Sequence, residues 1–245
     1  MTIKASDLVE ALGLLTRLPV RLRHAPRGAA AAWAYPLAGA VIGALAATIA
    51  WLCSGMPASV AAGFVLATTI IVTGALHEDG LADTADGLWG GWTPERRLDI
   101  MKDSRIGAFG VLALILGLGL RWAALTAIIA SHDPSAALFA TAILSRAPMV
   151  AVMHLLPHAR ANGLSASTGR PNATTTLWGL GLASLCALPL LGLPLIGVVV
   201  VLAILTGVII AIARAKIGGQ TGDILGATQQ LSEIAILTIL ATQAT

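Results

Sequence analysis

The 245-residue chain is short of charge, since Lys, Arg, Asp and Glu together make up 11% of it. Soluble domains carry about 25%. Hydrophobic residues reach 57%, and this balance excludes a soluble globular enzyme, a disordered chain and a nucleic-acid-binding module. A bilayer core takes about 20 apolar residues per helix. The composition predicts an all-α polytopic integral membrane protein, organised as one transmembrane domain over residues 1–245.

Several motifs of soluble enzymes are also missing. The two cysteines, Cys53 and Cys186, lie in apolar stretches without a Cys-x-x-Cys spacing, so we expect neither a disulfide nor a metal pair. The sequence has no His-Glu-x-x-His, no Gly-x-Ser-x-Gly and no Walker loop. Zinc hydrolysis, a serine triad and a P-loop ATPase therefore find no support.

Apolar runs long enough to cross a bilayer recur along the chain. They fall at about 33–53, 59–76, 108–130, 135–156, 175–192, 194–213 and 224–243. The fifth and sixth are nearly continuous, but one helix over both would be about 60 Å long, twice the hydrocarbon thickness. We therefore predict about seven transmembrane helices. Gly39 and Gly43 in the first run form a Gly-x-x-x-Gly, which permits close helix packing.

The basic residues indicate an orientation. Thirteen of the fifteen lie in the N-terminal segment, in 77–107, in 157–174 or at 214–216, whereas the alternate connections 54–58, 131–134 and 193 contain none. By the positive-inside rule, seven spans with the N-terminus inside place every basic segment in the cytoplasm.

The N-terminal segment does not look like a cleaved signal, because Asp7 and Glu10 interrupt the place of its apolar core. Leucines from Leu8 onward recur at i, i+4 and i+7 and form one apolar face. We expect residues 4–18 to form an amphipathic helix that lies on the membrane surface and ends before Pro19.

Two arginines, Arg121 and Arg146, lie near the middle of the third and fourth runs. A charge at that depth costs a few kcal/mol. Snorkelling toward the surface is one interpretation, but both residues are far from either end. A polar interior with paired groups is favoured, in which these arginines could hold an anionic substrate.

Acidic residues concentrate in one segment, with seven of the twelve within 78–103. Asp79, Asp83 and Asp86 follow i, i+4 and i+7, and Asp99 and Asp103 repeat the i, i+4 spacing. Like charges at these spacings repel, so a cation is needed, and Mg²⁺ prefers carboxylate oxygens. A solvated acidic loop is the alternative, but these carboxylates follow directly from an apolar run and share one helix face.

Other polar side chains suit a phosphate-containing ligand. A Gly-rich turn at 218–223 enters the last run, and such turns present backbone N–H groups to phosphate. Glu233 lies about ten residues further on, where exposure to lipid is disfavoured. The segment 157–174 adds His158 and Arg160. His77 adjoins the acidic run and either assists proton transfer or makes a simple helix-end contact.

Several of these motifs occur together in one known family. The strings are Leu15 to Val20, His77 to Gly87 (H-x-D-G-L-A-D-T-x-D-G), Met101 to Gly107 (M-K-D-S-R-x-G), Ser145-Arg146, and Gly218 to Asp223 with Glu233. In this order they resemble the cobalamin synthase family, also called adenosylcobinamide-GDP ribazoletransferases, nearly from end to end.

The resemblance implies the last assembly steps of vitamin B12 in the bacterial inner membrane, with an active site facing the cytoplasm. Adenosylcobinamide-GDP would react with α-ribazole, or with its 5′-phosphate, to give adenosylcobalamin or its phosphate and GMP. Mg²⁺ is the cofactor that the family implies. The chain is expected to lie in the lipid bilayer. Further copies of the chain and other corrinoid-pathway enzymes are its expected partners, and no nucleic acid is expected.

The same resemblance supports residue roles within an acidic catalytic segment, 77–107. The expected metal ligands are Asp79, Asp83, Asp86 and Asp103. Asp99 or Asp86 is the expected base, and His77 completes the catalytic set. The expected substrate-binding residues are Ser104, Arg105, Arg146, Gln220, Thr221, Asp223 and Glu233.

Two other functions stay open on the residues alone. Membrane CDP-alcohol phosphotransferases use carboxylate pairs for similar chemistry, but their Asp-Gly-x-x-Ala-Arg string is absent. A divalent-cation transporter would need acids along the whole membrane depth, and here they cluster toward one side. Release of GMP, compared with metal flux in liposomes, separates these functions.

Overall fold

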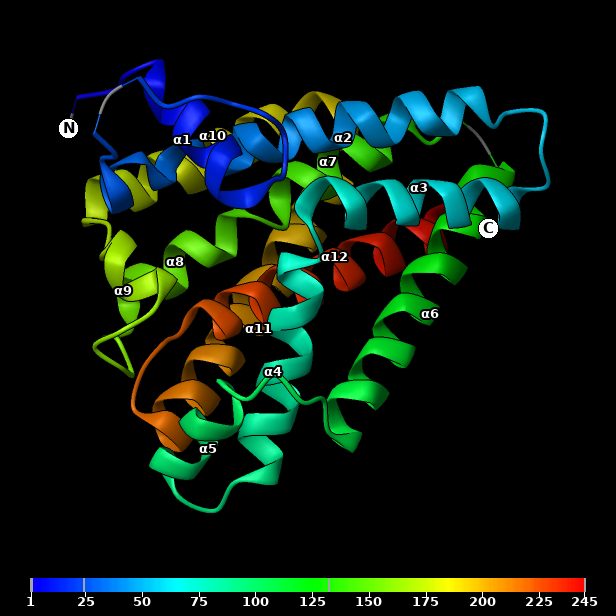
Figure 1. Cartoon of the computed structure of the whole chain (residues 1–245). Coiled ribbons are helices and arrows are strands. Elements are labelled where there is room, and N and C mark those ends of the chain that lie inside the picture. Colours follow the sequence, from blue (N-terminus) through cyan, green and yellow to red (C-terminus); the bar gives the residue numbers. More distant parts are fainter. Residues whose placement is uncertain (1, 24, 132, 245) are drawn as a thin grey trace.

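The computed structural model describes residues 2–23, 25–131 and 133–244, and every regular element in them is a helix (Figure 1). The predicted all-α class is confirmed. The elements are α1 (Ser6–Leu15), the 3-10 helix η1 (Gly28–Ala34), α2 (Tyr35–Leu52), α3 (Ala58–Thr73), α4 (Leu76–Gly90), α5 (Pro94–Ile100), α6 (Ala108–Ser131), α7 (Ser135–Leu144), α8 (Ala147–Leu155), α9 (Leu164–Thr168), α10 (Ala173–Leu191), α11 (Pro194–Ile217) and α12 (Gly222–Ala244).

The prediction of about seven membrane-spanning helices is confirmed. Among the described residues, six helical segments are long and apolar enough to cross a bilayer: 28–52, 108–131, 135–155, 173–191, 194–217 and 222–243. A seventh is possible if α3 and α4 together form one bent span. The nearly continuous fifth and sixth runs are separate helices, because Gly192 with a φ of +61° ends α10 just before Pro194 begins α11.

The second predicted run, 59–76, is not one continuous helix. The chain ends α3 at Thr73, and α4 leaves it at an angle of 86°. Gly74 and Ala75 both adopt left-handed backbone conformations, with φ of +64° and +56°. A left-handed residue cannot continue a right-handed helix, so the acidic segment becomes a separate helix that packs against α6 and α12.

The fourth span is also interrupted. The predicted run 135–156 consists of α7 and α8, with a break at Ser145 and Arg146. Pro148 lies in the first turn of α8. It has no N–H to donate, and its ring would collide with the carbonyl four residues earlier. The break therefore places Arg146 at the junction of two short helices.

The N-terminal helix is shorter than the predicted 4–18 and is attached to the bundle. Asp7 on α1 is buried, and its Oδ2 accepts hydrogen bonds from Trp33 Nε1 at 2.8 Å and from Arg27 Nη1 at 2.6 Å. α1 thus packs on η1 and the start of α2. Its position on a membrane surface stays a prediction.

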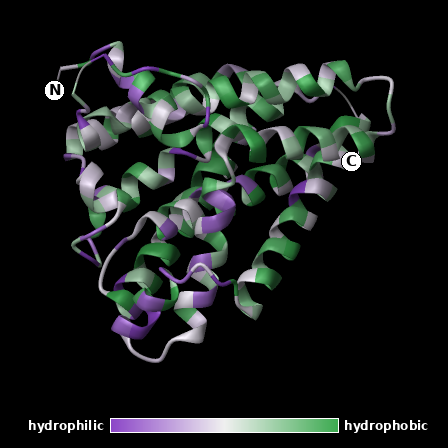
Figure 2. Ribbon diagram, viewed as in Figure 1, coloured by the Kyte–Doolittle hydropathy of each residue, from purple (hydrophilic) through white to green (hydrophobic). Residues whose placement is uncertain are grey.

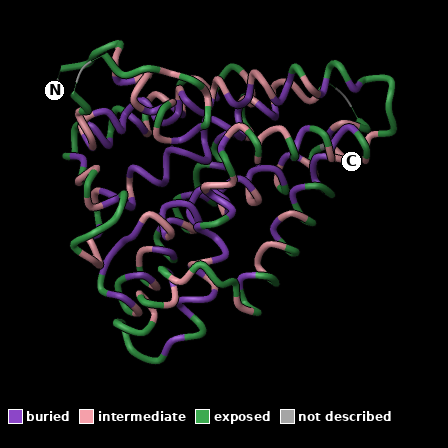
Figure 3. Tube along the Cα trace, in the orientation of Figure 1, coloured by how far each residue is buried: buried purple, intermediate pink, exposed green. Residues whose placement is uncertain are grey.

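Two apolar clusters form the core. One joins residues of α2, α3, α6, α7, α10, the start of α11 and the end of α12. The other joins residues of α1, η1, the start of α2, α4, α8, the end of α11 and the start of α12. Figure 2 shows hydrophobic residues along α2, α3 and α6, and hydrophilic residues along α4 and α5 and near the N-terminus. Figure 3 shows that much of α8 and α12 is buried.

The two ends of the bundle differ in the connections they carry. The loop between α2 and α3 and the C-terminus lie at one end, whereas the N-terminus, α1 and α9 lie at the other (Figure 1). The loop between α2 and α3, which has no basic residue, thus lies opposite the basic N-terminal segment, and the orientation in the membrane stays a prediction.

Candidate functional site

The site begins at a crossing of α4 and α12. A Cβ atom on Gly80 would lie 2.9 Å from the Asp223 carbonyl oxygen and 3.0 Å from Gly226 Cα. The two backbones are therefore in direct contact, which only glycine permits at these positions. This crossing brings Asp79 on α4 and Asp223 on α12 to one cavity, although 144 positions of sequence separate them.

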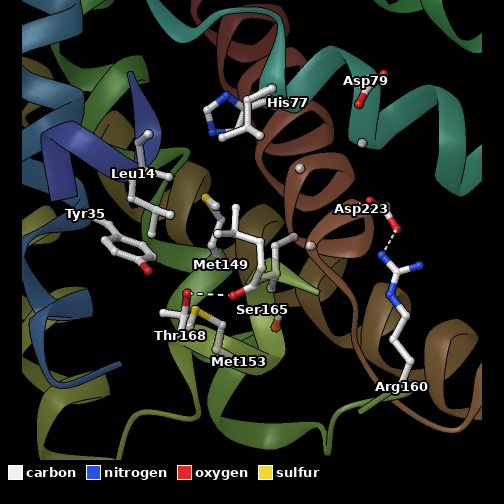
Figure 4. A pocket seen from close by; sticks show the side chains of 17 residues that line it. Leu14, Tyr35, His77, Asp79, Met149, Met153, Arg160, Ser165, Thr168 and Asp223 are labelled. Atoms are coloured by element: carbon white, nitrogen blue, oxygen red, sulfur yellow. Dashed lines mark hydrogen bonds and ion pairs between the residues drawn. The ribbon is translucent and has the colours of Figure 1, made fainter. Parts of the chain in front are cut away.

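The cavity has a volume of about 200 Å³. Figure 4 shows Leu14, Tyr35 and Met149 on one side of it, and Asp79, Asp223 and Arg160 on the other. Its walls thus come from α1, α2, α4, α8, α12 and the segment around α9. It is apolar at one side and charged at the other.

The charged side carries more negative than positive groups. Arg160 Nη2 lies 3.2 Å from Asp223 Oδ2, which also accepts a hydrogen bond of 3.1 Å from Thr221 Oγ1. Asp79 is exposed and Asp83 is half-buried, and Asp83 lies in the repulsive field of Asp79 and Asp223. Arg160 Nη1 is buried without a hydrogen-bond partner in the described part of the chain. One arginine thus faces three carboxylates.

His77 lines the cavity next to Asp79 on α4. Its ring is buried and lines the cavity, and its Nε2 has no hydrogen-bond partner among the described residues. A buried ring nitrogen without a partner is rare in folded proteins. The fold thus leaves a polar atom unsatisfied in the lining of the cavity.

Asp86 has a different environment from the other two aspartates of α4. It is buried, and its carboxylate oxygens accept hydrogen bonds from the backbone N–H groups of Gly107 at 2.7 Å and Gly110 at 2.8 Å. These groups belong to the N-terminus of α6, so Asp86 satisfies orphan donors there. A side chain larger than hydrogen at Gly107 or Gly110 would collide with it.

The end of the predicted catalytic segment lies apart from the cavity lining. Asp103 forms a two-oxygen ion pair with Arg105, with Nη2 and Oδ2 2.6 Å apart. Hydrogen bonds from Arg105 lower the pKa of Asp103 to about 2. Asp99 on α5 and Ser104 are exposed. Of the four predicted metal ligands, the structure keeps Asp79 and Asp83 together and directs Asp86 and Asp103 to other partners.

The Gly-rich turn supports the segment that carries Arg160. Gln220 is buried, its Oε1 accepts a hydrogen bond from Ser165 Oγ, and its Nε2 lies 2.9 Å from His158 Nδ1. Its backbone N–H donates to Pro157 O at 2.8 Å. Thr221 is buried as well. The predicted substrate-binding side chain of Gln220 thus positions loop 157–165. The Thr221 hydroxyl bonds to Asp223 and to the N–H of Ile224 at the start of α12, and Asp223 reaches the cavity.

A separate polar layer lies between the two apolar clusters. Its members are Glu78, Arg121, Ser145, Arg146, Gln229, Gln230 and Glu233. Arg121 pairs with Glu78 at 2.8 Å and with Glu233 at 2.7 Å. Arg146 donates to Ala142 O at 2.8 Å and to Ser145 Oγ at 3.1 Å. Both arginines are buried and neither snorkels. The predicted substrate ligands Arg146 and Glu233 belong to this layer and not to the cavity.

Part of the site had little signal in the sequence. Tyr35, Met149 and Met153 lie in apolar runs and carry no motif. Arg160 was one of several polar residues in its segment. The glycines at positions 80 and 226 are a signal that the sequence does contain, since small residues mark helix crossings in membrane proteins.

These features describe a multi-pass helical protein with a cavity that is apolar at one side and rich in carboxylates at the other. The family model described as cobalamin-5-phosphate synthase matches residues 7–241. The chain belongs to this family.

Curated relatives agree over nearly the whole chain. A protein of Bradyrhizobium diazoefficiens named adenosylcobinamide-GDP ribazoletransferase is 47% identical over 242 residues, which cover 96% of this chain and 93% of the relative. Proteins with the same name from Mesorhizobium japonicum and Sinorhizobium medicae are both 46% identical, over 95% and 96% of this chain and 92% and 95% of their own lengths. No solved structure matches the chain.

Proposed function

We propose that this protein is an adenosylcobinamide-GDP ribazoletransferase. It moves adenosylcobinamide phosphate from adenosylcobinamide-GDP to a ribose hydroxyl of α-ribazole, or of α-ribazole 5′-phosphate, and releases GMP. The membership of the family and the relatives' shared name support this activity. The observation that carries it in the structure is the cavity where Asp79, Asp223 and Arg160 meet.

The reaction exchanges one phosphorus–oxygen bond for another. A ribose hydroxyl that is free in both acceptors bonds through its oxygen to the phosphorus attached to cobinamide and loses its proton. The bond from that phosphorus to the bridging oxygen breaks, and GMP leaves with the electron pair. Catalysis of such transfers is mostly positioning and neutralisation of charge. Arg160 Nη1, the donor without a partner, suits a phosphate oxygen of the diphosphate. Asp79 is exposed at the cavity and accepts the hydroxyl proton.

The donor set suits Mg²⁺, which neutralises phosphate charge when it is bound. Among the described residues, no three His, Cys, Asp or Glu side chains are close enough to hold an ion unaided. Mg²⁺ usually uses only one or two carboxylates, with water and substrate phosphates as the other ligands. Asp79 and Asp83, on one face of α4, would hold it together with the diphosphate.

We place this chemistry on the cytoplasmic side of a bacterial inner membrane. The cavity is lined by α1 and the segment around α9, at the end that carries the basic N-terminal segment. Nucleotide substrates are cytoplasmic, and their negative charge suits a basic surface.

A reconstituted assay tests the proposal. The purified protein in lipid discs receives adenosylcobinamide-GDP, α-ribazole and Mg²⁺, and chromatography follows GMP and the corrinoid product. We expect equal amounts of GMP and adenosylcobalamin, formed only when α-ribazole is present. GMP release without α-ribazole, or no reaction together with divalent-metal flux in liposomes, would contradict the proposed function.

A further inference from the structure

The apolar side of the cavity has no part in the phosphoryl chemistry. Its side chains come from α1, α2, α8 and α9: Leu14, Leu15, Tyr35, Met149, Met153 and Leu164. Tyr35 and Met153 are buried, with 3% and 1% of their surface exposed. A largely buried apolar wall beside a charged reaction centre indicates a substrate part that is itself apolar.

The size of the cavity restricts what can enter it. An apolar cavity of about 150 Å³ takes up benzene, whereas sites for drug-sized ligands measure about 300–1,000 Å³. The volume of about 200 Å³ therefore suits a flat ring system of two fused rings. It is far too small for a corrin macrocycle.

The polar atoms of the cavity distinguish between candidate rings. Ser165 Oγ donates to Gln220, and Thr168 Oγ1 donates to Leu164 O at 2.8 Å, so both hydroxyl protons are engaged. His77 Nε2 has no partner in the described structure. Asp79, Asp223 and Arg160 line the opposite side of the cavity and are assigned to the diphosphate by the proposed function. A guanine ring beside the apolar wall would therefore leave several of its donors and acceptors unpaired, at a cost of about 1–3 kcal/mol each. A benzimidazole joined to ribose has one free ring nitrogen, which His77 can serve.

We propose that this cavity binds the aromatic base of the acceptor nucleoside. The ring lies between Tyr35 and the methionines Met149 and Met153, which offer aromatic and sulfur contacts. The free ring nitrogen bonds to His77, and the reacting ribose hydroxyl reaches the side of Asp79 and Asp223. The guanosine and corrinoid parts of the donor stay outside. This inference rests on the proposed function and names the substrate that fills the cavity.

A substitution that fills the cavity should affect the KM values of the two substrates differently. Met153→Trp places a larger ring in the space, and we expect the KM for α-ribazole to rise at least about tenfold, equivalent to about 1.4 kcal/mol of binding. The KM for adenosylcobinamide-GDP should change less than about twofold. Ile212→Trp is the matched control, because it adds the same side chain in an apolar groove between α4 and α11, away from this cavity.

A substitution that enlarges the cavity predicts a gain of activity, which a variant that merely fails to fold cannot show. Met149→Ala should accept a riboside whose base has a third fused ring, with a higher kcat/KM than the wild type shows for it. Calorimetry of α-ribazole binding to wild-type and Met153→Trp protein, without the donor, gives a readout independent of turnover.

The outcomes separate the two proposals. A wild-type protein that turns over normally, with Met153→Trp raising the KM for adenosylcobinamide-GDP, would show guanine in the cavity and overturn the inference alone. Unchanged KM values for both substrates and unchanged calorimetric binding would also overturn it. A wild-type protein that forms no product would overturn the proposed function, whereas calorimetric binding of α-ribazole that Met153→Trp abolishes would still support the cavity assignment.

Discussion

The guanidinium of Arg121 and the carboxylate of Glu78 form a buried ion pair, with Nη1 and Oε1 2.8 Å apart. The other Nη of Arg121 lies 2.7 Å from Glu233 Oε1. One side chain of α6 therefore joins α4 to α12, and Glu78 directly precedes Asp79. These two ion pairs hold the carboxylates of α4 in position relative to Asp223.

Removing this arginine should destabilise the protein strongly. Arg121→Met leaves Glu78 and Glu233 buried without their partner, and breaking a buried pair on one side costs about 3–5 kcal/mol. Thermal unfolding in detergent measures the loss, and the triple variant with Glu78→Gln and Glu233→Gln should recover much of it. An unchanged melting temperature for Arg121→Met would contradict the claim that its ion pairs hold α4 and α12 together.

The glycine crossing should be sensitive to a single methyl group. Gly80→Ala would place its Cβ 3.0 Å or less from backbone atoms of α12, and such overpacking costs about 1–3 kcal/mol. We expect lower stability and a lower kcat together, because Asp79 moves away from Asp223. Gly207→Ala on α11, where the new Cβ meets nothing within 4 Å, is the control and should be neutral or stabilising. Equal behaviour of the two variants would argue against backbone contact at Gly80.

The two aspartates at the charged side should be required for turnover but not for folding. Asp83→Asn and Asp79→Asn each remove a carboxylate from the charged side, and loss of one electrostatic contribution to catalysis typically costs about a hundredfold or more. We therefore expect GMP release to fall at least about a hundredfold. Each change also removes one of several mutually repelling charges. The melting temperature should stay the same or rise. Glu95→Gln on the exposed α5 is the matched control and should keep its rate. Near-normal activity of Asp83→Asn would refute its role.

Asp86 should behave as a structural residue. Asp86→Ala removes the acceptor of two backbone N–H groups at the start of α6, and loss of such a cap costs about 0.5–2 kcal/mol. At temperatures where the variant is folded, we expect most of its activity to remain. A variant with the wild-type melting temperature and no turnover would instead support the metal role that the sequence motif implies.

The pair of Asp103 and Arg105 makes stability depend on acid. The pKa of Asp103 is depressed to about 2 by Arg105, whereas an unfolded Asp titrates near about 3.9. The stabilising contribution is complete above the unfolded value and disappears as the pH falls to about 2. The stability difference between wild type and Arg105→Gln, followed by denaturant unfolding, should be constant near neutrality and shrink in that window. A difference that grows in acid would exclude the pair as its source.

Spacing alone treated Asp79, Asp83 and Asp86 as equals, since they share one face of a helix. The structure separates them, because α6 begins beside Asp86 and its N–H groups take up that carboxylate. Arg121 and Arg146 were likewise equivalent at mid-span. Only Arg121 meets two carboxylates within ion-pair distance among the described residues, because the break between α7 and α8 turns Arg146 toward Ser145.

The sequence by itself determined that the chain is an all-helical membrane protein with about seven spans and an acidic segment, because a bilayer demands long apolar runs and leaves charge only where it has a use. The tertiary structure decided which charges meet. The left-handed turn at Gly74 and Ala75 and the contact of Gly80 with Gly226 bring α4 against α12, and such contacts depend on the packing of distant segments, which no local pattern encodes.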